Sequence, residues 1–262
     1  MPEGDTILRA ARTLNRALSG QKVIRAEAPG GRLRVTPIVG QSITHVEANR
    51  KHMFIHFANR LTLHSHMGMH GSWHLYRPGE RWRKSPNSAR IVLATEPFIA
   101  VCFTPQTLGL VAPSDVERVE ARLGPDILSP DFDLNQAMRN LQGDAERPIG
   151  EAIMDQSRVA GIGNIYKSES LHAVRIHPLS AVGSLSDETL RSLLTTARKM
   201  MQFNVQPQVA VRRTRAGTDG YAVYMRKEKA CYACGAGIEM IRQGELKRST
   251  YFCPYCQKQV ER

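Results

Sequence analysis

The spacing of apolar residues divides the chain into a helix, a strand-rich stretch, a helical stretch and a short strand-rich tail. Apolar residues recur at helical spacing from Ile7 to about Leu18, and Asp5 or Thr6 is a suitable N-cap for this helix. From Gln21 to about Leu110, short β-rich runs alternate with turn residues. The expected strands are Val23-Ile24, Leu33-Val35, Ile43-Val46, Met53-Phe57, Leu61-Leu63, Trp73-Tyr76, Ile91-Ala94 and Ile99-Phe103. Strands at this density predict an antiparallel sandwich or barrel.

The second half of the chain changes to a mostly helical pattern after Pro113-Ser114-Asp115. The expected helices are Val116–Leu123, Leu134–Leu141, Ile149–Gln156, Asn164–Ala173 and Asp187–Asn204. The last forty or so residues return to short strands around four cysteines. We therefore expect an α+β protein with a β-rich domain at 1–113, a linker at 114–126, a helical domain at 127–220 and a cysteine-rich module at 221–262.

Composition and charge indicate what kind of molecule the protein binds. The 262 residues are 42% hydrophobic, and no run approaches the length of a membrane span. Because no secretion signal is evident, we expect a cytoplasmic protein without a membrane. The net charge is +12, and Arg212 to Arg262 hold 11 Lys and Arg against 5 Asp and Glu, a net +6. Such a basic chain is typical of nucleic-acid-binding proteins, although a merely solvated basic surface is the alternative.

Four of the five cysteines form two closely spaced pairs. The spacing Cys231-x2-Cys234-x18-Cys253-x2-Cys256 fits a template for a tetrahedral zinc site. Four thiolates close the coordination sphere, so we predict one structural zinc ion rather than a hydrolytic one; a redox pair is the alternative. Between the pairs, a hairpin would present the basic stretch Lys247-Arg248-Ser249-Thr250 as a phosphate clamp. Cys102 stands alone in an apolar run and is expected to be a buried small hydrophobe.

The amino terminus is the candidate nucleophile. Removal of Met1 would expose Pro2 as a secondary amine, and a terminal amine has a reference pKa of about 7.7–8.0, well below the value for Lys. A neutral amine can attack a carbonyl-like carbon and form a Schiff base. Glu3 is adjacent and can carry the protons that this attack requires. Taken alone, however, Met-Pro-Glu is also an ordinary start of a chain.

Three further stretches carry polar groups at turns. In the Gly-rich stretch from Asp155 to Tyr166, Asn164 would cap a helix whose N–H groups suit a phosphate, although a tight structural turn is the alternative. Lys51 lies at the head of a strand, and a solvated basic turn is the favoured interpretation of this stretch when it is taken alone. His64 and His66 share a strand face and lead to the turn Met67-Gly68-Met69-His70-Gly71. Metal binding by this histidine pair is disfavoured because no third ligand is evident.

Taken together and in this order, these motifs resemble the formamidopyrimidine-DNA glycosylase/endonuclease VIII family. The resemblance covers essentially the whole chain, and Gly124-Pro125-Asp126 and Arg175-Ile176-His177-Pro178 also fit the family pattern. It implies an N-terminal helix plus antiparallel β-sandwich, then a helix–two-turn–helix domain ending in a β-hairpin zinc finger. It also implies damaged DNA as partner, and we expect a monomer in the bacterial cytosol, nucleoid-associated when it is bound to DNA.

The resemblance implies a role for each matching residue. Pro2 would attack C1′ of a flipped nucleotide, Glu3 would act as proton donor and shuttle, and Lys51 and Arg248 would assist β- and δ-elimination. His66, Arg122 and Asn164 would contact the DNA backbone. Met69, flanked by Gly68 and His70, would fill the space left by the flipped base. The implied activity is bifunctional DNA glycosylase and DNA-(apurinic or apyrimidinic site) lyase, acting in base excision repair.

Two positions depart from the family pattern. Thr6 stands where the family usually carries Glu, which leaves lesion handling at that position open. The formamidopyrimidine branch has an Arg-Arg-Phe-Gly segment, and the matching stretch here is Gln106-Thr107-Leu108-Gly109. The absent arginine and aromatic wedge favour the endonuclease VIII-like branch and oxidised pyrimidines. Three alternatives remain: 8-oxoguanine or formamidopyrimidine preference with the same chemistry, a catalytically inactive damaged-DNA binding protein if Met1 is retained, and a basic zinc-ribbon protein that binds nucleic acid generally.

Overall fold

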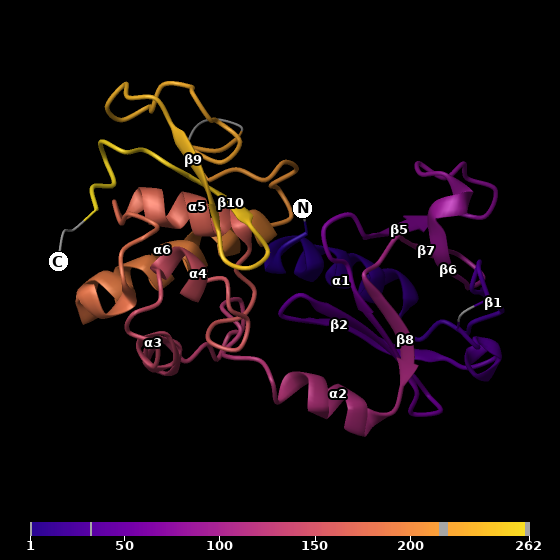
Figure 1. Ribbon diagram of the computed structural model, residues 1–262. Helices are drawn as coiled ribbons and strands as arrows, with labels where there is room; N and C mark the ends of the chain where they lie inside the picture. The colour runs from indigo at the N-terminus through magenta and orange to yellow at the C-terminus, as the bar shows by residue number, and fades with distance from the viewer. Residues whose placement is uncertain (1, 32, 215–219, 260–262) are drawn as a thin grey trace. The chain divides into compact units, whose positions relative to one another are not determined.

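A computed structural model describes residues 2–31, 33–214 and 220–259. It divides the chain into two compact units, Met1–Arg122 (unit 1) and Leu123–Arg262 (unit 2), shown from indigo to magenta and from magenta to yellow in Figure 1. Among the described residues, no helix is long and apolar enough to cross a membrane. The fold is α+β with antiparallel sheets, as predicted.

Where unit 1 is described, it contains two four-stranded antiparallel sheets and two α-helices. One sheet has the order β2-β3-β4-β8 and the other β1-β6-β7-β5. The strands are β1 (Arg25–Glu27), β2 (Ile43–Asn49), β3 (His52–Phe57), β4 (Thr62–His66), β5 (Ser72–Tyr76), β6 (Ala89–Ala94), β7 (Ile99–Phe103) and β8 (Thr107–Val111). The helices are α1 (Gly4–Leu18) and α2 (Pro113–Glu120), with short 3₁₀ turns at Thr36–Ile38 and Pro86–Ser88.

Helix α1 is held against the first sheet by one apolar stripe. Ile7, Ala11, Leu14 and Leu18 are buried at helical spacing and share a core cluster with residues of both sheets. The Asn15 side-chain carbonyl also accepts the backbone N–H of Val46 on β2, at 2.7 Å. These contacts fix the helix, and hence the residues that precede it, relative to the β2–β3 hairpin.

The described part of unit 2, residues 123–214 and 220–259, contains four α-helices and one β-hairpin. The helices are α3 (Leu134–Gln142), α4 (Ile149–Ala152), α5 (Asn164–Ala173) and α6 (Asp187–Val205), with a 3₁₀ turn at Val182–Ser184. Strands β9 (Glu239–Gln243) and β10 (Arg248–Phe252) form the hairpin. Helix α5 is buried along nearly its whole length, because α6 and β10 both pack on it. It is therefore the central element of this unit.

Several expected elements differ in the structure. Leu33–Val35 is not a strand, and the chain enters a 3₁₀ turn at Thr36 instead. Pro37 lacks the N–H that a strand in a ladder would need. The expected helix from Ile149 ends at Ala152, and β8 lies in a stretch without a predicted strand. The expected linker 114–126 holds most of α2, which begins at Pro113, a residue suited to a first helical turn.

Candidate active site and nucleic-acid interface

The amino-terminal segment leads directly into α1. The N-cap is Glu3, not Asp5 or Thr6 as predicted, because the Glu3 backbone is extended while Gly4 is already helical. The Thr6 hydroxyl accepts the Glu3 backbone N–H at 3.0 Å and donates to the Glu3 carbonyl at 2.9 Å. Glu3 is fully buried and Pro2 is half-buried. Thr6 therefore anchors the residue next to the predicted nucleophile.

Lys51 lies in the turn that joins β2 to β3. Asn49 and His52 are paired across the two strands, so Arg50 and Lys51 form the two-residue loop. Arg50 has a φ of 62°, a conformation that a non-glycine residue adopts at some cost. The Asn49 side chain bonds both the Arg50 guanidinium and the carboxylate of Glu120 at the end of α2. These bonds hold the loop in one orientation.

Three histidine rings lie together beside this loop, with His64 stacked on His52 and His66 tilted against it. His52 Nδ1 lies 2.8 Å from His64 Nε2, and the ring centroids of His52 and His66 are 4.8 Å apart. Burial, followed by the charges of neighbouring groups, lowers the pKa of His52 to about 3. Burial also lowers the pKa of His64 and His66, although a bond to Gln106 opposes the shift at His66. The rings are therefore neutral at physiological pH, and a neutral stack close to Lys51 adds no repulsion toward it.

His52 is the third histidine beside His64 and His66, and the sequence alone did not reveal it. Its identity follows from strand register, since His52 is directly opposite His66 on the neighbouring strand. Among the described residues, however, neither His64 nor His66 belongs to a group whose ligand atoms converge on a metal.

The turn after β4 exposes Met69 and requires glycine. The Met69 side chain is 54% exposed. Gly68 has a φ of 59°, and a Cβ at this position would lie 2.8 Å from the Gln106 side chain. Gln106 also donates its backbone N–H to the His66 carbonyl at 2.8 Å. The Gln106 contact and the glycine conformation together present the apolar tip of Met69 to solvent, with exposed His70 beside it.

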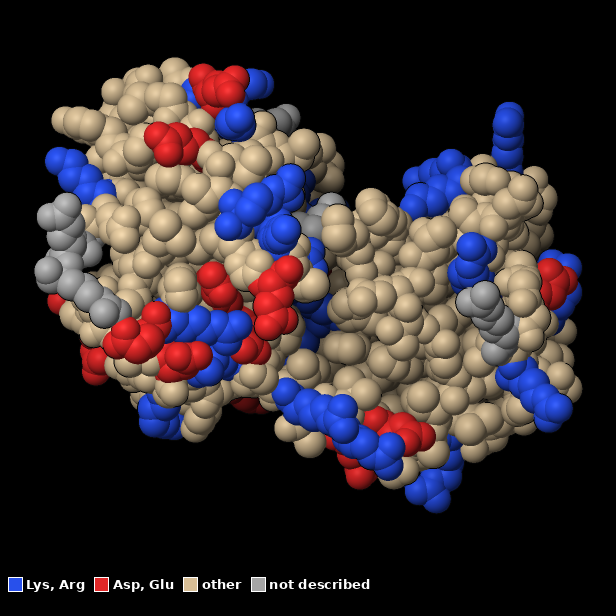
Figure 2. All heavy atoms as spheres, viewed as in Figure 1, with Lys and Arg blue, Asp and Glu red and all other residues tan. Residues whose placement is uncertain are grey.

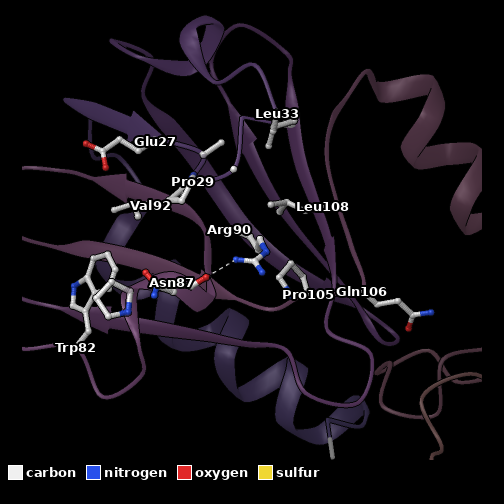
Figure 3. A pocket seen from close by; sticks show the side chains of 13 residues that line it. Glu27, Pro29, Leu33, Trp82, Asn87, Arg90, Val92, Pro105, Gln106 and Leu108 are labelled. Atoms are coloured by element: carbon white, nitrogen blue, oxygen red, sulfur yellow. Dashed lines mark hydrogen bonds between the residues drawn. The ribbon is translucent and has the colours of Figure 1, made fainter.

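A pocket of about 870 Å³ adjoins this turn in unit 1 (Figure 3). Gln106 and Leu108 lie on its wall, with Trp82 across from them and Arg90 projecting between. The Arg90 guanidinium donates to the Asn87 carbonyl at 2.9 Å. None of the described residues predicted as catalytic lines this pocket. The pocket is connected to the predicted site only by Gln106 and Leu108, which belong to the stretch that departs from the family pattern.

In unit 2, the Gly-rich stretch is a packed turn that leads into α5. A Cβ on Gly124 would lie 2.6 Å from the Arg158 carbonyl, so Gly124-Pro125-Asp126 can pack against this turn only with glycine there. The Gln156 side chain accepts the Gly161 N–H at 3.0 Å and donates to the Ile162 carbonyl at 3.1 Å. These bonds fix the approach of the chain to Asn164. The exposed Arg122 lies in the turn after α2, at the end of unit 1.

Asn164 is the first residue of α5 and is bonded to the β-hairpin; the N-cap is Gly163, not Asn164 as predicted. Its Nδ2 donates to the Ser249 carbonyl at 2.6 Å, while its buried Oδ1 has no hydrogen-bond partner among the residues that the structure describes. Ser249 follows Arg248, which is half-buried at the start of β10. The helix start and the predicted phosphate-gripping arginine are therefore held together within unit 2.

A second buried bond strengthens the same connection. The Lys167 ammonium, fully buried on α5, donates to the Thr250 hydroxyl at 2.6 Å, and this hydroxyl donates to Gln243 Oε1 at 2.6 Å. The chain of bonds crosses from α5 to β10 and then to β9. Because a buried ammonium is costly without partners, this network ties the orientation of the hairpin to the helix.

Glu169 is a buried anchor that the sequence did not reveal. Its carboxylate accepts the backbone N–H groups of Ala222, Val223 and Tyr224 at 2.7, 2.8 and 2.7 Å, as well as the Thr214 hydroxyl. It therefore holds the segment that enters the cysteine-rich module. The motif interpretation passed over Glu169 because a glutamate on a helix is ordinary, and its partners lie more than forty residues away.

The four paired cysteines converge as predicted. Their sulfur atoms all lie within 4.8 Å of one another, and the Cys231–Cys256 and Cys234–Cys253 sulfur distances are 3.9 and 3.4 Å. Tetrahedral thiolates around zinc are about 3.8 Å apart, given a bond of about 2.3 Å. The His172 ring lies 3.6 Å from the Cys231 sulfur, where it can orient that ligand. The group can hold a metal ion.

The predicted residues fall into two sets. Unit 1 carries Pro2, Glu3, Lys51, His66, Gly68, Met69, His70 and Arg122, and unit 2 carries Asn164, Arg248 and the four cysteines. On the face drawn in Figure 2, Lys and Arg lie on both units and acidic side chains lie beside some of them. Unit 2 also contains the ion pair Arg147–Asp155, at 2.7 Å.

Each unit matches the model of a known protein domain. Residues 1–109 match the formamidopyrimidine-DNA glycosylase N-terminal domain, and residues 123–215 match the formamidopyrimidine-DNA glycosylase H2TH domain. The chain is 36% identical to a probable endonuclease 8 2 of Streptomyces coelicolor, over 98% of this chain and 94% of the relative. It is 35% identical to the DNA-(apurinic or apyrimidinic site) lyase Nei2 of Mycolicibacterium smegmatis, over 98% and 99% of the two chains.

Solved structures share the fold. A Lactococcus lactis formamidopyrimidine-DNA glycosylase bound non-covalently to DNA with an AP site superposes with a TM-score of 0.83, at 23% identity over 98% of this chain and all of that one. The matching family model and relatives place the chain in the class of DNA glycosylases with AP lyase activity. The chain belongs to the formamidopyrimidine-DNA glycosylase/endonuclease VIII family.

Proposed function

We propose that this protein excises oxidised pyrimidines from DNA through a Schiff base on Pro2 and then cuts the strand by β- and δ-elimination. The observation that carries the proposal is the amino-terminal geometry. The half-buried Pro2 directly precedes a fully buried Glu3, whose backbone is fixed by Thr6 at the start of α1. Membership of the family gives this arrangement its chemical meaning.

The proposed reaction begins at the Pro2 nitrogen, after Met1 has been removed. The nitrogen lone pair attacks C1′, the glycosidic bond breaks, and the departing base takes up the proton that the Pro2 nitrogen releases. Glu3 donates a proton to the sugar-ring oxygen as the ring opens, which leaves an iminium between Pro2 and C1′. Loss of a C2′ proton expels the 3′ phosphate, and a second elimination expels the 5′ phosphate. Water then hydrolyses the iminium and regenerates the amine.

The other predicted residues would hold DNA during these steps. Lys51 and His66 on unit 1 and Arg248 on unit 2 supply cations or N–H donors for phosphates. Asn164 would contact the backbone near the lesion, and Arg122 would make a second contact. Met69, on its glycine-dependent turn between Gly68 and His70, would occupy the space of the flipped base.

We also propose that the four cysteines bind one structural zinc ion. Zinc would brace the module that carries Arg248 and would take no part in the bond changes, because four thiolates leave no open position. We expect the protein to act as a monomer on DNA in the bacterial cytosol. A single species of monomer mass in light scattering would agree with this expectation, and a dimer at working concentration would contradict it.

The proposed lesion preference rests on Gln106-Thr107-Leu108-Gly109, the stretch that follows β7. Gln106 packs on Gly68, and Leu108 lies in the wall of the pocket, where the formamidopyrimidine branch has arginine and phenylalanine. Without these residues we expect weak discrimination of the opposite base. The similar proteins named endonuclease 8 support the same branch. Preference for 8-oxoguanine or formamidopyrimidine is the second candidate.

Borohydride trapping tests the proposal. Met1-free protein, verified by mass spectrometry, should form a covalent complex with a duplex that contains an oxidised pyrimidine, and a panel of lesions ranks the substrates. Glu3→Gln should lose base excision. Arg248→Ala should lose δ-elimination and bind DNA more weakly, whereas Arg242→Ala, on the neighbouring strand of the same hairpin, serves as the matched control. Absence of trapping by the Met1-free chain, with DNA binding retained, would favour the inactive binding protein.

A further inference from the structure

A second group of possible metal ligands lies on unit 1, on β2 and β3. His45 and Glu47 come from β2 and His56 from β3, and their ligand atoms all lie within 4.8 Å of one another. His56 Nε2 is 2.9 Å from Glu47 Oε1, and His45 Nε2 is 3.9 Å from the same oxygen. The two imidazoles are stacked, with centroids 4.1 Å apart and planes inclined by 10°.

An irregularity in β2 makes this convergence possible. Ile43 pairs with Phe57 and His45 pairs with His56, so two steps along β2 match one step along β3. Ile43 and Val46 consequently both point into the core, while His45 and Glu47 face solvent. Strict alternation from Ile43 would have turned His45 inward. The register shift therefore aims two ligands outward beside His56, a known use of bulged strands.

We propose that His45, Glu47 and His56 bind a late first-row divalent transition metal ion, with Zn²⁺ and Ni²⁺ as the ions that suit these ligands. Two imidazole nitrogens and one carboxylate oxygen are a common donor set for such ions. Water would complete the coordination, because His45 and Glu47 are about half exposed, at 51% and 46% of their side-chain surfaces. The site is distinct from the four cysteines, which lie in unit 2.

Hydroxyl groups already orient both imidazoles. Thr62 Oγ1 lies 3.0 Å from His56 Nδ1, and Thr44 Oγ1 lies 3.3 Å from His45 Nδ1. In the metal-free state His56 donates its Nε2 proton to Glu47 and can accept from Thr62 at Nδ1. When an ion binds at Nε2 of His56, that nitrogen must give up its proton, so the neutral ring carries its proton at Nδ1 instead. The Nδ1–H group then donates to the Thr62 hydroxyl, because a hydroxyl can act as donor or as acceptor.

Equilibrium dialysis against Ni²⁺ tests the site, with the tag-free full chain first brought to one zinc ion per chain, the amount that the four cysteines take up. Elemental analysis then counts nickel and zinc separately, so that nickel in the cysteine site would be seen as lost zinc. We expect one nickel ion per chain with zinc retained. His45→Ala and Glu47→Gln, both at exposed positions, should abolish this binding. His74→Ala, which removes an imidazole from the other sheet of unit 1, should bind nickel like the wild type.

Thr62→Val provides the sharper variant, because it keeps all three ligands. Loss of the hydroxyl partner of His56 should weaken nickel binding by about 10- to 100-fold. Circular dichroism confirms that each variant is folded. The proposal is overturned if the wild type takes up no nickel, if nickel enters only as zinc leaves, or if His45→Ala binds as tightly as His74→Ala. None of these readouts uses DNA, so the result is independent of the proposed function.

Discussion

Replacement of Glu169 by glutamine should destabilise unit 2 far more than its conservative chemistry suggests. The buried carboxylate accepts three backbone N–H groups, from Ala222, Val223 and Tyr224. A glutamine side chain keeps one acceptor oxygen and turns an NH₂ group toward N–H donors. A buried group left without its partner costs about 1–3 kcal/mol, so loss of one or two acceptor contacts should cost about 2–4 kcal/mol. Glu169→Ala should cost about 3–5 kcal/mol.

Urea unfolding measured with two probes tests this reasoning. Both tryptophans, Trp73 and Trp82, belong to unit 1, whereas most helical residues belong to unit 2. Glu169→Gln should therefore shift the transition seen by circular dichroism more than the transition seen by fluorescence. Glu245→Gln, the same change at an exposed position in the β9–β10 turn, is the control. A Glu169→Gln midpoint equal to that of the control would refute the anchoring role.

Three further predictions concern unit 1 and the cysteine group. Thr6→Ala removes the acceptor of the Glu3 N–H and should cost about 1 kcal/mol and slow base excision, whereas Thr13→Ala, exposed on the same helix, should affect neither. The pKa of His52 is about 3 in the folded protein and 6.5 in the unfolded chain. As the pH drops below 6.5, the unfolded chain therefore binds this proton while the folded protein does not, and the free energy of unfolding falls. At pH 5 the loss is roughly 2 kcal/mol, and His52→Gln should flatten this part of the pH profile of unfolding. Cys256→Ser should lower the bound zinc per chain and the Tm of unit 2; equal zinc content in elemental analysis would contradict the four-thiolate assignment.

The family and its main motifs were accessible from the sequence because each motif is local. Four cysteines in two close pairs predict a metal site from spacing alone, and their sulfur atoms converge in the structure. Helix α5 begins at Asn164 as expected, since the glycines before it end the preceding turn. The apolar stripe of α1 likewise depends only on a period of 3.6 residues. The roles assigned to Pro2, Glu3, Lys51 and Arg248 remain predictions.

Tertiary structure decided the features that depend on strand register and on distant partners. His52 joins His64 and His66 only because the β3–β4 pairing places it opposite His66. The convergence of His45, Glu47 and His56 depends on one register shift in β2, which reverses the face of each side chain that follows it. Glu169 became an anchor because backbone N–H groups more than fifty residues away meet its carboxylate. Local pattern specifies which element forms, whereas these contacts follow from packing between elements, which no short stretch of sequence encodes.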